Sequence, residues 1–566
     1  MADLDRALLA SWVVVPVLDL WFALQGFVAP SPLQIVLEIL LPGLLMINHL
    51  HFSRGRAPWL GSTLWPAGLT LWLQLVALSP GGMGHRLVFG LGVAVCVVAG
   101  VRGSWWLGAL PRWPGRPGRW RWGGVLASIG AVILGRYAVL SWSDGGRGAV
   151  AKPALALLEE LLPLRASGAG SSGPPIVLIT VDTMRWDHLV RTRSWARLAA
   201  RGRRWERAMS TSSWTLPAMA SLYTGLEPGG HGANARVNGG YQAIEPSAPR
   251  LPVELGEQGY TTAAVFSNAW LLDTLGFRRG FHRYWHLNHD RSHRLVFAGV
   301  PSVPPWSAQA VTDRGLSVLS RLPDRGSFLW IHYVDPHLPY AHAASPLTAG
   351  LGDGRLRGGL ILDEAGREEV REAYAREVEH LDLQLERLLD GLEARGWLET
   401  GWIVLTSDHG EELFDHGGAE HGHSHHGEVV DVGLVIVGPR LDAGPGSGVA
   451  SLIDVTATLR GIAGLAPVGP GFDLRSPLPA DRIATAYGNA YVGVARSARS
   501  GSLRVIVEPD GRVHAYDLAF DPAERSPLAL PDDHRLIEAA LGVQGPEQQE
   551  AADVNTEALK ALGYLE

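Results

Sequence analysis

Two apolar runs, at Ile176–Val181 and Trp402–Ser407, have the length and composition of buried strands. Polar residues follow each run at once: Asp182 after the first, and Asp408 with His409 after the second. Near-continuous apolar runs of this length are typical of strands that are buried on both faces of a parallel sheet. Because open α/β sheets bind ligands beyond the carboxyl ends of their strands, we expect Asp182, Asp408 and His409 to meet at one site.

The first ~140 residues have a different pattern, in which long apolar stretches alternate with short polar segments. The stretches lie at about residues 8–28, 33–52, 64–78, 87–101 and 122–142. Most of them approach the ~20 apolar residues that a helix needs to cross a bilayer, and the two shortest need flanking residues. We therefore predict an α-helical membrane domain of about five spans at residues 1–142. The alternative is a set of buried core helices.

Arginine placement predicts how this membrane domain is oriented. Arg54 and Arg56 lie between the second and third stretches, and five further arginines lie between the fourth and fifth. The positive-inside rule then places the N-terminus inside and everything after the fifth stretch outside. We expect a juxtamembrane helix and a flexible Gly/Ser linker at residues 143–173. The remainder of the chain would lie outside the cytoplasm, attached to a bacterial inner or cell membrane.

A hydroxyl residue, Thr215, lies between the two strand-like runs, two residues before Pro217. Two carboxylates and an imidazole can bind a divalent cation, and a hydroxyl beside that cation can act as a nucleophile. The cation makes this possible because it lowers the pKa of the hydroxyl and holds its oxygen in place. The sequence therefore indicates an enzyme. A purely structural interpretation is that Thr215 caps a helix that has Pro217 in its first turn.

The residues around these positions resemble the sulfatase branch of the alkaline phosphatase superfamily. Five segments carry the similarity: Val181–His188, Thr215–Gly232, His332–Tyr340, Ser407–Glu412 and His421–Ser424. They follow one another in the order of the family. Two later segments, Tyr516–Arg525 and Leu559–Leu565, look like its C-terminal subdomain. The match covers roughly residues 174 to 566.

The resemblance implies an α/β alkaline-phosphatase-like catalytic domain at residues 174–475 and a small C-terminal α+β subdomain at residues 476–566. The main sheet would be mainly parallel, with helices on both faces. The family's motifs imply metal ligands at Asp182, Thr215, Asp408 and His409, a nucleophile at Thr215, catalytic histidines at His337 and His421, and substrate contacts at Asn268 and His423. The divalent metal would be Ca, Mg, Mn or Zn, because one imidazole with carboxylates suits each of them.

Three departures from the family pattern concern the substrate. Thr215 stands where sulfatases carry the cysteine or serine that is oxidised to formylglycine, so no formylglycine is expected. Met219 replaces the arginine that supports that residue. The only lysines, Lys152 and Lys560, lie far from the positions at which family lysines bind sulfate. Threonine is the nucleophile in related phosphodiesterases and in membrane phosphoethanolamine and glycerol-phosphate transferases, so sulfate and phosphate esters both stay open.

Three functions fit this pattern. The first is a membrane-anchored, metal-dependent hydrolase of sulfate or phosphate esters. The second is a lipid-dependent transferase that moves a phosphoethanolamine or glycerol-phosphate group onto envelope glycans or lipids, and the third is a non-catalytic membrane scaffold. The expected partners are an ester of the cell envelope or an exported small molecule, together with membrane lipid. A net charge of −7 without a lysine-rich segment gives no reason to expect nucleic acid.

A histidine-rich segment runs from Asp415 to His426. His421 or His423 matches a family histidine, and we interpret His416, His425 and His426 as part of a solvated loop that binds metal only adventitiously.

Overall fold

The structure is a computed structural model. It describes residues 171–234, 236–237, 240–287, 307–340, 347, 356, 361–491, 493–529 and 534–543. The predicted membrane domain at residues 1–142, most of the linker, both lysines and the segment 559–565 lie outside the described residues. In the part that is described, no helix combines the length and the apolar character needed to cross a bilayer.

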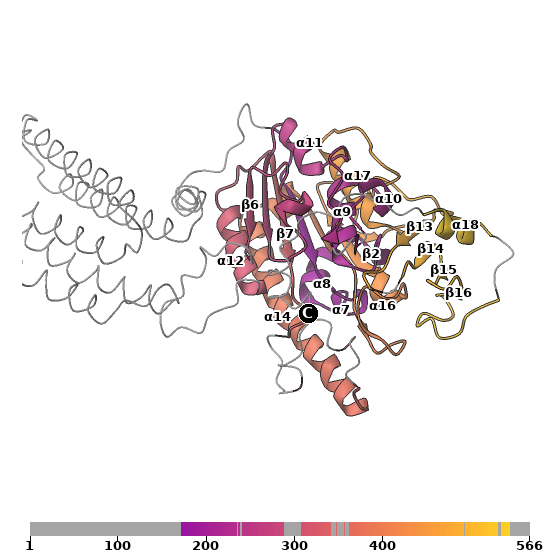
Figure 1. The fold of residues 1–566 in the computed structure, drawn as a ribbon. Helices are drawn as coiled ribbons and strands as arrows, with labels where there is room; N and C mark the ends of the chain where they lie inside the picture. Colours follow the sequence, from indigo (N-terminus) through magenta and orange to yellow (C-terminus); the bar gives the residue numbers. More distant parts are fainter. Residues whose placement is uncertain are drawn as a thin grey trace, which may run out of the picture. The chain divides into compact units, whose positions relative to one another are not determined.

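An eight-stranded sheet forms the centre of the described part, in the order β12-β2-β11-β8-β1-β7-β5-β6 (Figure 1). The strands are β1 Ile176–Val181, β2 Arg203–Met209, β5 Thr261–Phe266, β6 Arg283–His286, β7 Ser327–Tyr333, β8 Trp402–Ser407, β11 Asp431–Val437 and β12 Gly444–Pro445. The five strands from β8 to β6 run parallel, whereas β11 is antiparallel to both of its neighbours. The mainly parallel sheet is confirmed, and β1 and β8 have the predicted bounds.

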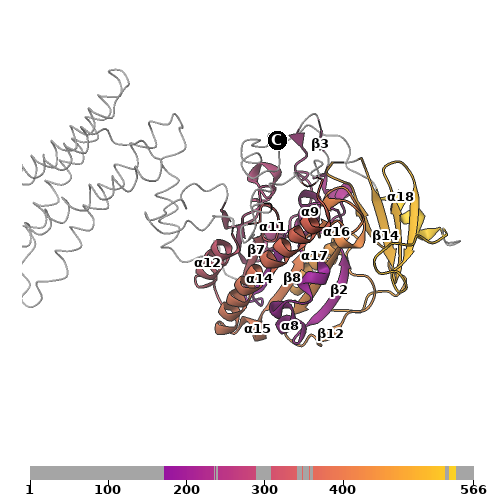
Figure 2. The same ribbon diagram turned by 90° about the horizontal axis from the view of Figure 1, so that it is seen from below.

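Helices cover both faces of this sheet, which explains why its central strands are apolar throughout (Figure 2). Along β1, Ile176 and Leu178 pack on one side, and Val177, Ile179 and Val181 pack on the other. The first side is covered by α9 Thr215–Thr224, α11 Leu251–Glu257 and α17 Leu452–Ile462. The second is covered by α7 Trp186–Leu189, α8 Arg193–Ala199, α12 Ala308–Leu319, α14 Glu364–Ala394 and α15 Trp397–Thr400.

The longest of the described helices, α14, has the sequence features of an amphipathic helix. It starts after Asp363, whose side chain accepts a hydrogen bond from the N–H of Gly366. Apolar residues such as Val370, Leu381 and Leu388 return at helical spacing and are buried against the sheet. The helix thereby holds a buried tyrosine, Tyr374, beneath the loop that follows β1.

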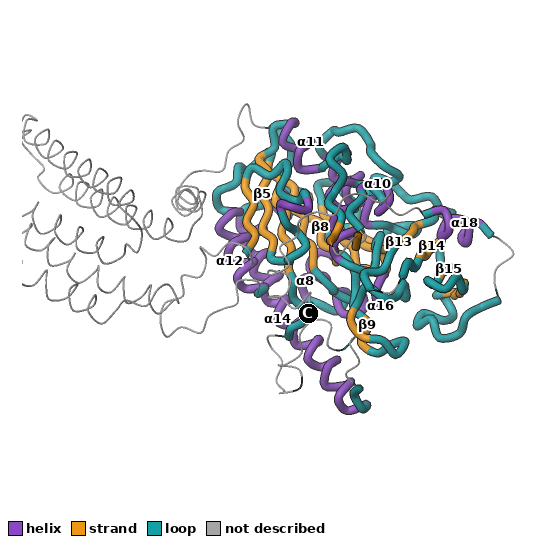
Figure 3. The backbone as a smooth tube through the Cα atoms, in the orientation of Figure 1, coloured by secondary structure: helices purple, strands orange, loops and turns teal. Residues whose placement is uncertain are grey.

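A second sheet lies near the C-terminal end of the described residues, with the antiparallel order β13-β14-β15-β16 (Figure 3). Its strands are β13 Ala484–Tyr487, β14 Arg496–Ser500, β15 Leu503–Val507 and β16 Val513–Asp517, and α18 Arg535–Gly542 packs on it. This is the expected four-stranded α+β subdomain. The remaining elements are α10 Pro228–His231, β3 Arg236–Val237, β4 Gly240–Tyr241, the 3-10 helix η1 Asp273–Leu275, β9 Glu412–Leu413, β10 Ala419–Glu420 and α16 Gly427–Val430.

Candidate active site

The pairing of β1 with β8 brings the first two candidate residues together. These strands are parallel and in register, with Val181 opposite Ser407, so Asp182 and Asp408 leave the sheet side by side. The N–H of Asp182 donates to the carbonyl of Tyr333 on β7, and the N–H of Asp408 donates to the carbonyl of Val181. The sheet ladder thus fixes the backbone of both residues at the edge where a ligand is expected.

Four predicted side chains converge at this edge, and all of them are buried. Thr215 Oγ1 lies 3.4 Å from Asp182 Oδ1 and 3.2 Å from His409 Nε2. His409 Nε2 lies 3.5 Å from Asp182 Oδ1 and 3.6 Å from Asp408 Oδ2. The idea that Thr215 serves as a helix cap is wrong, because Trp214 is the N-cap residue of α9 and no side chain caps that end. The hydroxyl of Thr215 instead contacts Asp182 and His409.

Asp182, Asp408 and His409 fit a divalent metal ion. Their ligand atoms lie within 4.8 Å of one another. Asp408 Oδ1 accepts from the N–H groups of Thr183, at 3.3 Å, and His409, at 2.8 Å, whereas Asp408 Oδ2 is buried without a hydrogen-bond partner. Such an oxygen is costly unless a cation meets it.

The protonation chemistry of the three residues supports the same assignment. Burial and the neighbouring Asp408 raise the pKa of Asp182 well above its usual range, and burial raises the pKa of Asp408 to about 8. Burial lowers the pKa of His409 to about 3, so the ring is neutral near pH 7. Its Nδ1 lies 2.9 Å from the carbonyl oxygen of Gly410 and donates to it, which leaves the lone pair of Nε2 for a cation. A cation would stabilise both carboxylates in their ionised form.

Asn268 lies at the end of β5 and contacts the first of these carboxylates. Its Nδ2 donates to Asp182 Oδ2, and its Oδ1 accepts from the N–H of Trp270 at 2.7 Å. The predicted contact with substrate stays a prediction. The observed contact makes Asn268 a support for Asp182, in the way that outer partners orient metal ligands.

Replacing Asn268 with alanine is expected to weaken metal binding by roughly 10–100-fold, the usual cost of losing such an outer partner. Titration of the metal-free protein with Mn²⁺ or Zn²⁺ would measure this. Asn489, whose Nδ2 donates to the carbonyl of His423, provides a control asparagine that supports a different residue. Equal affinity in Asn268→Ala and in the wild-type protein would contradict the supporting role.

Two further predicted residues, His337 and His421, lie beside the cluster. The ring centroid of His421 is 4.6 Å from that of His409 and 5.1 Å from that of His337. His421 Nδ1 lies 3.0 Å from Glu411 Oε1, and both side chains are buried. The imidazole of His421 is therefore oriented by a carboxylate.

Two acids that the sequence pattern does not single out hold His421 and His423. Glu411 contacts His421, and Glu412 Oε2 lies 2.7 Å from Nε2 of His423, the other predicted substrate contact. Both acids follow Asp408 closely in a motif that was recognised, and both are buried. The sequence pattern does not pair these acids with the histidines, because both their burial and their contacts depend on how the loop between them folds back.

Arg185 braces the loop that follows β1. Its guanidinium pairs with Asp187 at 3.0 Å and, in addition, with Asp415 at 2.6 Å. Tyr374 Oη donates to the carbonyl of Thr183 and accepts from the N–H of Arg185. Thr183 has φ of 53°, an uncommon left-handed conformation for threonine. This arrangement points the N–H of Thr183 at Asp408.

The interpretation of His416, His425 and His426 as a solvated loop is wrong. His425 is buried, with Nδ1 3.0 Å from Ser497 Oγ and Nε2 3.1 Å from the carbonyl oxygen of Gly488. His416 and His426 are both ion-paired. Their partners include residues more than sixty positions away, so the local sequence could not indicate them.

Comparison with known proteins places these features in context. The family model described as sulfatase matches residues 174–465, which is more than half of the chain. A comparison with curated proteins found no match.

Several solved structures are similar. A 2-O GAG sulfatase is 16% identical, with a TM-score of 0.53 over 65% of this chain and 90% of that chain. A protein solved with its substrate D-glucosamine-2-N,6-O-disulfate is 17% identical, with a TM-score of 0.53 over 65% and 97%. The yidJ protein of Bacteroides fragilis is 18% identical, with a TM-score of 0.51 over 66% and 94%. At such identities the similarity shows a shared fold.

Proposed function

Because this chain belongs to the sulfatase family of the alkaline phosphatase superfamily and is therefore an ester hydrolase, we propose that it is a membrane-anchored enzyme that cleaves sulfate or phosphate esters with Thr215 as its nucleophile. The carrying observation is the position of Thr215 Oγ1, which lies 3.4 Å from Asp182 Oδ1 and 3.2 Å from His409 Nε2. Among the contacts of the described residues, only this hydroxyl combines nucleophilic chemistry with contacts to both a candidate ligand carboxylate and a candidate ligand imidazole.

Enzymes of this family depend on a metal, and here Asp182, Asp408 and His409 would hold it, with Thr215 beside it. When bound, a divalent cation lowers the pKa of a neighbouring hydroxyl and offsets the charge that develops on the ester oxygens. The N-terminal end of α9 carries Thr215 and adds the partial positive charge of its free N–H groups. These features favour attack on an anionic ester.

The protein's own groups account for the two steps of the reaction. Thr215 Oγ1 releases its proton to solvent water and bonds to sulfur or phosphorus, while the bond between that atom and the leaving oxygen breaks. His421 or His337 protonates that oxygen, and Glu411 holds His421 in orientation for this task. Water then attacks the Thr215 ester, which releases sulfate or phosphate and restores the hydroxyl.

The membrane part of the proposal rests on the sequence. The apolar stretches of residues 1–142 and their arginine placement support an anchored protein with an extracytoplasmic catalytic domain. Envelope esters or exported small molecules would then be the substrates within reach. The threonine nucleophile and the predicted spans would equally suit lipid-dependent transfer, so the experiment must separate the two.

Removal of the metal is expected to lower hydrolysis by at least about a hundredfold, and adding the ion back should restore it. The test uses the full chain in detergent, with an aryl sulfate, an aryl phosphate monoester and an aryl phosphodiester assayed side by side. The preferred ester decides between sulfate and phosphate. Bound metal without turnover of any ester would favour lipid-dependent transfer, and absence of both would contradict an enzyme with this site.

A further inference from the structure

The loop that carries His421 is fixed at several points. We call residues 415–426 the histidine loop. At the start of the loop, Asp415 pairs with Arg185 at 2.6 Å. Further along, the N–H of Gly422 donates to the carbonyl of Ser213 at 2.9 Å. These contacts hold the loop to the segments that carry the metal-binding and nucleophilic groups. Its other end is held from the C-terminal subdomain.

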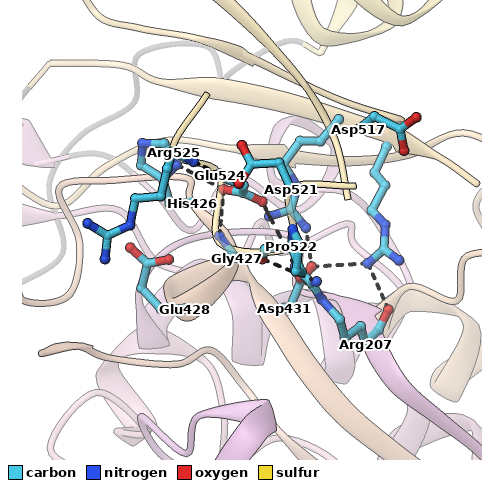
Figure 4. A network of polar contacts seen from close by, with 12 residues as sticks. Arg207, His426, Gly427, Glu428, Asp431, Asp517, Asp521, Pro522, Glu524 and Arg525 are labelled. Carbon is cyan, nitrogen blue, oxygen red and sulfur yellow. Dashed lines mark hydrogen bonds and ion pairs between the residues drawn. The ribbon is translucent and has the colours of Figure 1, made fainter. Parts of the chain in front are cut away.

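Glu524, which follows β16, makes several of the contacts at that end (Figure 4). Its Oε2 accepts from the N–H of Gly427 at 3.0 Å and lies 2.8 Å from His426 Nδ1. Its Oε1 accepts from Arg504, and its carbonyl oxygen lies 3.1 Å from His416 Nε2. Glu524 is buried and has φ of 56°, so surrounding contacts over-determine an uncommon backbone conformation.

His416 has an acceptor at each ring nitrogen. Nδ1 lies 2.6 Å from Glu428 Oε1, and Nε2 lies 3.1 Å from the carbonyl oxygen of Glu524. A neutral imidazole has only one N–H, so both contacts can be hydrogen bonds only when the ring is protonated. The ring also stacks on His426, with centroids 3.7 Å apart and planes 7° apart.

The surroundings of His416 favour this charged state. Burial alone would lower the pKa of His416, but Glu428, the carbonyl of Glu524 and Glu412 raise it to about 9. Asp521, in the same segment as Glu524, adds a further negative charge near the ring. The charge of His416 therefore persists at neutral pH.

A metal ion is the alternative occupant, because Glu412, His416 and Glu428 place ligand atoms within 4.8 Å of one another. Glu412, however, already accepts three hydrogen bonds: Oε1 accepts from the N–H groups of His416 and Gly418, and Oε2 faces His423 Nε2. A protonated imidazole also has no lone pair for a metal. The contacts therefore favour an ion-paired clamp.

We propose that Glu524 is a positioning residue of the active site, which together with protonated His416 clamps the histidine loop and so fixes His421 against His409 and His337. The inference rests on the proposed catalytic part of His421. Glu524 belongs to the segment Asp521–Arg525 of the C-terminal subdomain, and through this residue the segment contributes to the reaction. Loosening the clamp displaces the proton donor without removing a group that touches the substrate.

The test compares His416→Ala and Glu524→Gln with the wild-type full chain in detergent. His416→Ala is expected to lower kcat about tenfold with KM within about twofold, because small misplacements of catalytic groups are costly. Backbone amides of residues 415–427 should exchange with D₂O faster in both variants. Glu524→Gln, which keeps the size of the side chain, should lose at least as much kcat. His534→Ala, an exposed histidine replacement at the start of α18, should change neither quantity.

The pH dependence separates the clamp from a merely structural contact. Protonated His416 stabilises the folded histidine loop. This stabilisation is fully present below pH 6.5, the pKa of a histidine in the unfolded chain, and it is lost as the pH rises through about 9. The ratio of wild-type to His416→Ala kcat should thus be about ten near pH 7 and approach one near pH 10. A ratio that does not depend on pH, unchanged exchange in both variants, or one metal equivalent fewer in His416→Ala would overturn the proposal. If no ester is hydrolysed at all, the proposed function fails, and hydrogen exchange still decides whether the clamp exists.

Discussion

Replacing Thr215 with alanine is expected to lower kcat by at least about a thousandfold, while the protein stays folded and binds its metal. A covalent mechanism fails without its nucleophile, and only the background provided by the other groups remains. Thr215→Ser keeps the hydroxyl and should keep activity within about tenfold, because the β-methyl group only helps to fix the rotamer. The measurements are kcat on the preferred aryl ester, the amount of bound metal and the thermal midpoint.

The neighbouring Thr211 provides a matched control. It is also a buried threonine of the segment that leads into α9, but its Oγ1 has no hydrogen-bond partner. Thr211→Ala should leave kcat within about twofold, since no charged or reacting group depends on that hydroxyl. Full activity in Thr215→Ala would remove Thr215 from the mechanism and direct attention to a water nucleophile.

Replacing Asp431 with asparagine is expected to destabilise the protein by about 3–5 kcal/mol, the usual cost of removing one side of a buried ion pair. Asp431, the first residue of β11, is fully buried and pairs with three arginines, Arg207 at 2.6 Å, Arg499 at 3.2 Å and Arg504. Figure 4 labels Asp431 and Arg207. After the replacement Glu524 would be the acid left beside Arg504. Guanidinium denaturation, followed by tryptophan fluorescence, measures the change.

The pH dependence of this effect has a defined sign. Burial alone would raise the pKa of Asp431, but Arg504, Arg207 and Arg499 lower it to about 2. A depressed carboxyl pKa stabilises the fold above the unfolded value of 3.8 and ceases to do so as pH falls through about 2. The difference between the wild-type protein and Asp431→Asn should therefore be constant from about pH 5 to 8 and shrink below about pH 4.

The control is Asp510→Asn, which breaks an exposed pair with Arg512. Because solvent screens such pairs, the denaturation midpoint should not change measurably. Equal midpoints for Asp431→Asn and Asp510→Asn would show that the buried arginines find other partners, and the ion-pair argument would then be wrong.

The sequence identified Asp182, Asp408 and His409 because each of them follows an apolar run, which is a local pattern of the chain. The apolar runs at Ile176–Val181 and Trp402–Ser407 are typical of buried strands, and parallel strands end at a common edge. Asp182, Asp408 and His409 therefore had to emerge there. Thr215 joined them through its motif, and the structure brings all four side chains together.

The sequence could not assign the partners that orient these groups. Asn268 was expected to meet the ester, and in the structure its amide contacts Asp182. Glu411 was part of a recognised motif, yet its contact with His421 depends on how the loop between them folds back. Contacts of this kind depend on the path of a loop, for which the sequence pattern contains no periodic signal.

The sequence by itself determined the two strands Ile176–Val181 and Trp402–Ser407, their ends and the polar residues that follow them, because an apolar run and the residues after it are local features of the chain. Only the tertiary structure decided the environment of the histidine loop. His416 and His426 are polar residues in a polar stretch, and nothing near them in sequence predicts that Glu524, about a hundred residues later, holds them. The charge of His416 and the partial burial of both rings are set by the packing of the C-terminal subdomain against the loop, since an ion pair forms wherever the fold brings opposite charges out of water together.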